Sequence, residues 1–468
     1  MLVLDYLQRT GQANPEVQLT AEKYVATGYQ RLLTYEVPGG GYSLFGQAPA
    51  QVFLTAYGLM EFTDMARVHP VDQEMIDRTA RWLLAQQQPD GTWLEQGYSE
   101  HWRVDAELPT TAYITWALIE AGYKNTPQVE RALAYIRQFA GQENDAYGLA
   151  LIASALTADD PNEATTRAVL ARLYDMRVEA GDAVYWENAH ASFMGATGAS
   201  GSVETTALTA AAFIRAGVYP DAVSGALASL IQSKDSWGTW STTQATILSL
   251  KTLLLATEST GSAVEPATVL ISLNKEQTRQ ITIDSGNADV VHVVSFDQGF
   301  SPTGANRIQV AVANDSNLMY QVTTSYYLPW VDESPTPQAG TLIDIDLEYD
   351  RTRLTVNDTV TVEVGVRLNQ PGVVKMALVD LGLPPGFNVM TEDLNRLVEL
   401  GVIARYELTG RQIIIYLEDF SSEQPLDFSY RLRARFPMRA QTPPSSAYDY
   451  YNPTEQTTEA PLQVVVTD

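Results

Sequence analysis

A loop near residue 100 holds the side chains of this sequence that are best suited to chemistry. Asp105 and Glu107 lie there with Glu95 and Glu100, and His101 stands among them. A glycosidase needs two carboxylates that flank a sugar, so an acid pair here would indicate glycoside hydrolysis. The chain has 56 acidic residues, however, and such proximity is expected by chance. A solvated acidic loop is therefore the better interpretation.

His101 offers a second kind of chemistry. An imidazole titrates close to neutral pH, so it can act as a nucleophile and then as a base. The residue follows the turn Pro89-Asp90-Gly91 in the same loop. The alternative is a loop histidine that hydrogen-bonds to Glu100 or to solvent.

The composition excludes several classes of site. The chain has no cysteine, which excludes disulfides, thiolate metal sites and cysteine nucleophiles. Its four histidines are scattered without an HExxH motif, so we expect no metal and no cofactor. The net charge of −26 opposes binding to nucleic acid or anionic lipid. No apolar run approaches the ~20 residues of a membrane span, and the start of the chain lacks the features of a signal peptide.

The period of the apolar residues divides the chain into a helical part and a β part. In residues 127–139 apolar positions recur at i, i+3, i+4 and i+7, as on the buried face of a helix. Beyond Ser262 the period changes to two, as in residues 359–368 and 428–436. Helices first and strands later predict separate domains in a multidomain α + β chain.

The helical part repeats two kinds of segment. Segments rich in Ala and Thr lie near residues 53, 110, 145, 205 and 242, with a further inner-type segment near residue 2, and charged amphipathic ones near 22, 74, 127, 163 and 220. Small residues let a helix pack on both sides, whereas an amphipathic helix shows only one face to the core. Glycine–aromatic loops such as PDGTW and WGTW lie between them. The pattern predicts an α/α toroid over residues 1–258 that lacks one outer helix.

The β part is expected to contain two further domains. Residues 259–332 predict four or five short strands, among them ATVLISL, RQITID, DVVHVVSF and MYQVTTSYYL. Proline residues then mark a linker. Residues 333–468 predict a β-sandwich with a single helix, TEDLNRLVELG, for which Thr391 is the expected N-cap.

These segments, taken in order, resemble the C-terminal part of the alpha-2-macroglobulin and complement thioester proteins. VLDYL, GYQRLLTYE, GGGYSLFG and LTAYGLMEF resemble the start of a thioester domain, and WSTTQATILSLKTL resembles its last inner helix. Residues 259–332 resemble half of a CUB domain, while LGLPPGF, IIIYLED and SSAYDYY resemble the macroglobulin-like receptor-binding domain. The helix TEDLNRLVELG lacks the lysines that vertebrate members carry for endocytic receptors, which favours a bacterial-type member.

The resemblance implies a protease trap that works through an internal thioester. In the family, a Cys-Gly-Glu-Gln motif forms this bond, and once exposed it acylates an amine or a hydroxyl. The motif lies just upstream of the segment that matches VLDYL, and this sequence begins there with Met1. A truncated sequence, a gene fragment or a mis-set start codon would each explain that. We expect no thioester Cys or Gln, and no acyl donor, within the chain.

The same resemblance assigns roles to particular side chains. His101 is a candidate for the acyl acceptor that redirects the thioester toward hydroxyls. Tyr448, Tyr450 and Tyr451 are candidates to shield the thioester, where the C-terminal sandwich packs on the toroid. The alternative is that these tyrosines belong to a strand core and edge.

We therefore expect the C-terminal fragment of an alpha-2-macroglobulin-like endopeptidase inhibitor, without turnover of its own. It would act outside the cytoplasm, in the periplasm, at the cell surface or after secretion. Its expected partners are proteases, in the full-length protein. The alternative is a carbohydrate-active α/α-toroid enzyme with β accessory domains, which a wide acidic cleft with paired carboxylates would favour.

Overall fold

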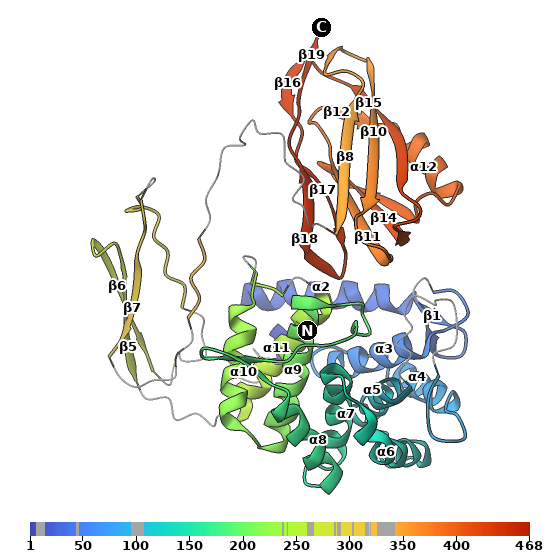
Figure 1. Cartoon of the computed structure of the whole chain (residues 1–468), viewed down its shortest axis with the longest axis vertical. Coiled ribbons are helices and arrows are strands. Elements are labelled where there is room, and N and C mark those ends of the chain that lie inside the picture. The colour runs from blue at the N-terminus through green and yellow to red at the C-terminus, as the bar shows by residue number, and fades with distance from the viewer. Residues whose placement is uncertain are drawn as a thin grey trace.

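The computed structural model describes residues 1–5, 15–43, 46–94, 107–235, 238–240, 242–259, 266–284, 287, 292–301, 304–313, 318, 320–324 and 342–468. The first half of the chain forms a helical body, a small sheet follows, and a larger β body contains the C-terminus (Figure 1). None of the helices in these ranges is long and apolar enough to cross a membrane.

Inner and outer helices alternate along the helical body. The inner helices, which pack against one another in chain order, are α3 (Val52–Met65), α5 (Glu107–Glu120), α7 (Ala146–Asp159), α9 (Gly198–Ala216) and α11 (Thr243–Ser259). The outer helices are α2 (Pro15–Leu33), α4 (Gln73–Ala85), α6 (Pro127–Phe139), α8 (Ala164–Asp175) and α10 (Pro220–Gln232). From α4 onward each outer helix packs on the inner helix that precedes it. Residues 2–5 add one helical turn.

The composition of each helix explains its position. In α7 every residue from Ala146 to Thr157 is buried, because its small and apolar side chains let helices pack on all sides. The amphipathic helix α4 buries only one face, formed by Met75, Ile76, Thr79, Ala80 and Leu83. The α/α toroid pattern predicted from the sequence is confirmed.

The glycine–aromatic loops repeat one structural device. Trp93, Trp186 and Trp240 are fully buried. Their indole N–H groups donate to carbonyl oxygens in the last turn of the preceding outer helix, those of Leu83 (2.8 Å), Leu173 (2.6 Å) and Leu230 (2.5 Å). Their backbone N–H groups donate to threonine hydroxyls of the inner helix that follows each loop, those of Thr111, Thr206 and Thr246. The last carbonyls of a helix have no partner within it, so these tryptophans cap one helix and fix the next.

Short hairpins complete the loops of the helical body. They are β1 (Glu36–Val37) with β2 (Gly41–Tyr42), and β3 (Val178–Ala180) with β4 (Ala183–Tyr185). A single turn of 3-10 helix, Ala140–Gln142, follows α6.

The small sheet has the antiparallel order β6-β5-β7, with β5 (Ala267–Leu273), β6 (Gln277–Ile283) and β7 (Ile308–Val312). The strands expected at ATVLISL and RQITID are present. Those expected at DVVHVVSF and MYQVTTSYYL are not found in their described parts, residues 292–296 and 320–324, which run without strand pairing. Alternation predicts an extended chain, but pairing also requires a neighbouring strand to accept it.

The C-terminal body contains three sheets. Their orders are β12-β15-β10-β8, β13-β14-β11-β17-β18 and β16-β19-β9. The strands are β8 (Ile343–Tyr349), β9 (Arg353–Thr355), β10 (Thr359–Leu368), β11 (Val373–Gly382), β12 (Phe387–Val389), β13 (Arg405–Leu408), β14 (Gln412–Ser421), β15 (Leu426–Ala434), β16 (Met438–Gln441), β17 (Ser445–Asp449), β18 (Asn452–Glu459) and β19 (Gln463–Thr467). The alternating apolar residues of β10 and β15 face a common core. Phe436, expected to continue this alternation, lies beyond β15 and is exposed.

One helix, α12 (Thr391–Glu399), interrupts the strands as expected. Its N-cap is Met390 and not Thr391, and no side chain caps the helix. The first turn is held differently, because the Asp393 carboxylate accepts hydrogen bonds from the backbone and guanidinium of Arg431. A cap predicted from residue type is therefore replaced by a contact with β15, which the local sequence does not reveal.

Candidate functional site

Aromatic side chains gather where the inner helices begin. Phe53 lies 4.9 Å from Tyr113 and 4.8 Å from Phe193, measured between ring centroids. Tyr147, in the first turn of α7, lies 5.9 Å from Phe193 and accepts a hydrogen bond from its backbone N–H at 3.3 Å. All four rings are buried. They tie the loop before α9 to the first halves of α3, α5 and α7.

Glu204 is a buried carboxyl next to this aromatic cluster. It is 0% exposed, and neither carboxyl oxygen has a hydrogen-bond partner among the described residues. Burial raises its pKa to about 7, and the neighbouring Ser192 hydroxyl opposes that shift. Burial, with the Glu204 charge as a smaller cause, also raises the pKa of Tyr147. The group is therefore largely neutral below neutral pH, because its charged form has lost its solvation.

The C-terminal body touches the helical body beside this cluster. The Tyr451 ring packs on Gly195, where an added Cβ would lie 3.1 Å from Tyr451 Cδ2. The Thr197 backbone N–H donates to Asn452 Oδ1 at 2.9 Å. The Asp449 carboxylate accepts from the Tyr451 backbone N–H at 2.9 Å and from Asn452 Nδ2 at 2.7 Å. Asp449 thus shapes the turn between β17 and β18 that presents both contact residues.

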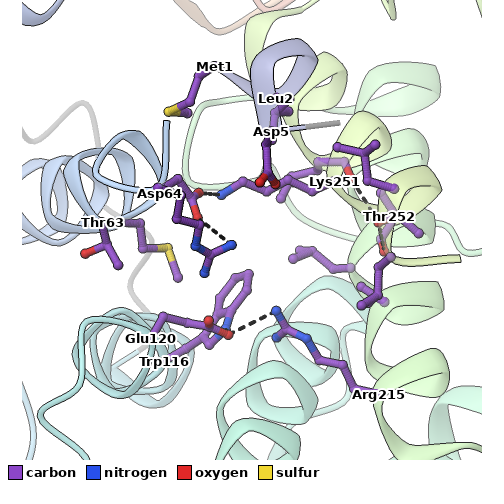
Figure 2. A pocket seen from close by; sticks show the side chains of 18 residues that line it. Met1, Leu2, Asp5, Thr63, Asp64, Trp116, Glu120, Arg215, Lys251 and Thr252 are labelled. Carbon is purple, nitrogen blue, oxygen red and sulfur yellow. Dashed lines mark hydrogen bonds and ion pairs between the residues drawn. The ribbon is translucent and has the colours of Figure 1, made fainter. Parts of the chain in front are cut away.

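A cavity of about 130 Å³ lies at the opposite end, where the inner helices finish (Figure 2). Asp64 of α3 pairs with Lys251 of α11, and Glu120 of α5 lies 3.0 Å from Arg215 of α9. The first halves of α3 and α5 meet at the aromatic cluster, and the C-terminal ends of both helices meet at the cavity. These two inner helices therefore run in the same direction. Among the described residues, no three His, Cys, Asp or Glu side chains are grouped to hold a metal ion.

Known families match both bodies. Residues 1–255 match the A-macroglobulin TED domain, and residues 372–461 match the A-macroglobulin receptor binding domain. The chain belongs to the alpha-2-macroglobulin family. Ovostatin from Gallus gallus is 23% identical and aligns with 97% of this chain. Thioester-containing protein 1 allele S3 from Anopheles gambiae is also 23% identical over 97% of the chain. The chain spans 31% of the first relative and 33% of the second.

Solved bacterial members of the alpha-2-macroglobulin family share the fold. The native Escherichia coli protein, in a crystal structure from domain MG7 to the C-terminus, gives a TM-score of 0.65 at 16% identity. That match covers 96% of this chain and 68% of the other. The Salmonella protein reacted with methylamine gives a TM-score of 0.63 at 17% identity, over 94% of this chain and 27% of the other.

The structure describes only some of the site residues that the sequence of this family member predicts. His101, Glu95, Glu100 and Asp105 fall outside the described residues. Glu107 begins α5, and its carboxylate accepts a hydrogen bond from the Tyr135 hydroxyl at 2.5 Å.

The three tyrosines that were candidates to shield the thioester differ in their burial and contacts. Tyr451 is buried against Gly195, Tyr450 is 44% exposed, and Tyr448 lies within strand β17. Sequence reasoning missed Glu204, Gly195 and Asn452. For Glu204 a signal was present, because it is the only acidic residue in the Ala- and Thr-rich helix α9.

Proposed function

We propose that this member of the alpha-2-macroglobulin family acts as the C-terminal part of an endopeptidase inhibitor, a protease trap outside the cytoplasm. The observation that carries the proposal is the contact of Tyr451 and Asn452 with residues 195–197, at the end of the helical body where the inner helices begin. A C-terminal domain held at this end can cover a reactive bond until a change of conformation removes it.

The direction of the inner helices supports this role for the contact. Met1, Leu2 and Asp5, from the start of the chain, line the cavity where the inner helices finish. An inner helix that ends there and runs parallel to α3 would begin beside Phe53. In the family the Cys-Gly-Glu-Gln motif precedes the segment that matches VLDYL. We therefore propose that the thioester of the longer protein lies beside the aromatic cluster.

Within this proposal the side chains have separate tasks. Tyr451 shields the thioester, while Tyr448 stays within its strand and Tyr450 remains at the surface. His101 precedes α5 in the sequence, and the resemblance to the family leads us to propose it as the acyl acceptor. Residues 1–258, 259–332 and 333–468 form the thioester-type, CUB-like and receptor-binding domains. The chain itself has no cysteine to form a thioester. Within this proposal it acts as part of an inhibitor and performs no turnover.

The carbohydrate-active enzyme is not favoured. The match of residues 1–255 to the A-macroglobulin TED domain argues against it. In addition, the carboxylates of the cavity lining are matched by Arg67, Arg215 and Lys251, so the cavity is not the acidic cleft expected of a glycosidase.

The test uses this chain and a longer protein that includes the sequence encoded upstream of Met1. Each is incubated with labelled methylamine, with and without an activated protease, and adducts are identified by mass spectrometry. We expect no adduct on this chain and a protease-dependent adduct on the longer protein. Tyr451→Ala should allow labelling without protease, whereas the control Tyr450→Ala should behave like the wild type. Labelling of this chain, or equal behaviour of the two variants, would contradict the proposal.

A further inference from the structure

The cavity at the end of the inner helices has the properties of a small-ligand site. We propose that it binds a small apolar carboxylate, whose charged group lies among Arg67, Arg215 and Lys251. The apolar part of the ligand would contact the leucines of α9 and α11. This inference does not depend on the protease-trap function, because the cavity lies at the opposite end of the helical body from the Tyr451 contact.

The size and lining of the cavity limit the apolar group. Leu208 and Leu248 are buried side chains of the wall, and Met60, Leu254 and Leu255 extend it. A cavity of about 150 Å³ with apolar walls is known to hold benzene. The 130 Å³ available here therefore suits a branched aliphatic group or a phenyl ring.

The arginines of the lining keep unused hydrogen-bond donors. A guanidinium carries five N–H donors. Arg67 comes no closer than 3.6 Å to Asp64, its side chain is 46% exposed, and it makes no hydrogen bond to the described residues. Arg215 reaches Glu120 at 3.0 Å, and its guanidinium lies 5.6 Å from the centroid of the Trp116 ring. Figure 2 shows Arg215 reaching into the cavity from α9.

The carboxylates of the lining are more fully occupied than the arginines. Glu120 accepts a hydrogen bond from the Trp116 indole N–H at 2.9 Å and also faces Arg215. Asp64 is shared between Lys251 and Arg67. Asp5 adds a third carboxylate to the lining, so its three carboxylates equal the three cationic side chains in number (Figure 2). The preference of the cavity for one kind of ligand therefore comes from the spare N–H donors of the arginines. These donors favour a ligand with a hydrogen-bond acceptor over a cationic ligand.

A carboxylate is the acceptor that fits these donors best. Its two oxygens match the planar fork of a guanidinium and can accept two parallel hydrogen bonds. Two sources share this chemistry, a free carboxylic acid and the C-terminal residue of a peptide. The side chains of Arg67, Arg215 and Lys251 are 30–46% exposed, so the rim is open enough for either.

The experiment is a titration of the whole chain with isocaproate, followed by calorimetry and by a shift in melting temperature. Isocaproate combines a leucine-like aliphatic group with a carboxylate. We expect saturable binding of isocaproate and no binding of isocaproamide, its neutral counterpart. A peptide ending in a free leucine carboxylate and its C-terminal amide form the second pair. If isocaproate binds and the peptide acid does not, the natural ligand is a free carboxylic acid. If isocaproate and the peptide acid both bind, the site accepts the C-terminal ends of peptides as well.

Matched variants locate the site. Arg67→Gln, just beyond α3, should weaken binding roughly tenfold, the scale of one charge-assisted hydrogen bond. Arg81→Gln on the outer helix α4 is the control and should change nothing. Ala211→Leu should block the cavity, and melting curves check that each variant folds. The proposal is overturned if no ligand binds at millimolar concentration, if the amides bind as well as the acids, or if Arg67→Gln and Arg81→Gln bind equally.

Discussion

Replacing Glu204 by glutamine removes a proton-binding group from the interior of the helical body while keeping the side chain's size. The wild-type carboxyl is 0% exposed, and burial raises its pKa from the ordinary value of 4.5 to about 7. The folded protein therefore holds this proton more tightly than the unfolded chain does. The resulting stabilisation is complete below pH 4.5 and is lost as the pH rises to about 7.

The size of the effect follows from that shift. Each pKa unit corresponds to about 1.36 kcal/mol, so the shift of Glu204 makes the wild type about 3 kcal/mol less stable at pH 8 than it would be with a permanently neutral group. The buried amide of Glu204→Gln carries its own cost, but that cost is the same at every pH. The stability difference between variant and wild type should therefore move by about 3 kcal/mol in the variant's favour between pH 4.5 and pH 8.

Urea unfolding followed by tryptophan fluorescence measures this change. Seven of the eight tryptophans lie before residue 260, so the signal reports mainly the helical body. Other titrating groups contribute equally to both proteins and cancel in the difference. Glu130→Gln, at an exposed position of the outer helix α6, is the matched control and should show no pH-dependent difference from the wild type. If the free energies of Glu204→Gln and wild type depend on pH in the same way, Glu204 is not a neutral buried carboxyl and the reasoning fails.

Three further predictions concern other contacts. Trp186→Phe removes the indole donor to the Leu173 carbonyl and should lower the free energy of unfolding by about 1–3 kcal/mol in urea titrations. Trp82→Phe should have a smaller effect. Equal losses of stability in the two variants would refute the capping role of Trp186. Asp64→Asn weakens the pairing of α3 with α11 and should speed hydrogen exchange in α11 more than in α7; unchanged exchange would show that the ion pair is dispensable. Asn452→Ala removes the acceptor of the Thr197 N–H and should increase proteolytic cleavage near residues 192–198. The control Tyr450→Ala should leave cleavage unchanged. Equal cleavage of the two variants would mean that the contact does not hold the two bodies together.

The sequence alone was enough to predict the kinds of element and the order of the bodies. The 3.6-residue period of α4 and the small residues of α7 indicate an outer and an inner helix, because periodicity and side-chain size are local properties. The absence of cysteine excludes an internal cysteine thioester within the chain without any structure. The segments from VLDYL to SSAYDYY resemble the family that the comparisons then showed.

Only the tertiary structure decided which residues meet. Thr197 and Asn452 are separated by 255 positions, and nothing near either residue predicts their hydrogen bond. The structure distinguishes Tyr451 from Tyr448 and Tyr450 by its contact with Gly195, and replaces the expected Thr391 cap by the Asp393–Arg431 contact. The same limit applies to Glu204, whose neutral state depends on complete burial by several elements. Local patterns determine the conformation of a segment, whereas burial, electrostatics and contact depend on segments that are far apart in the chain.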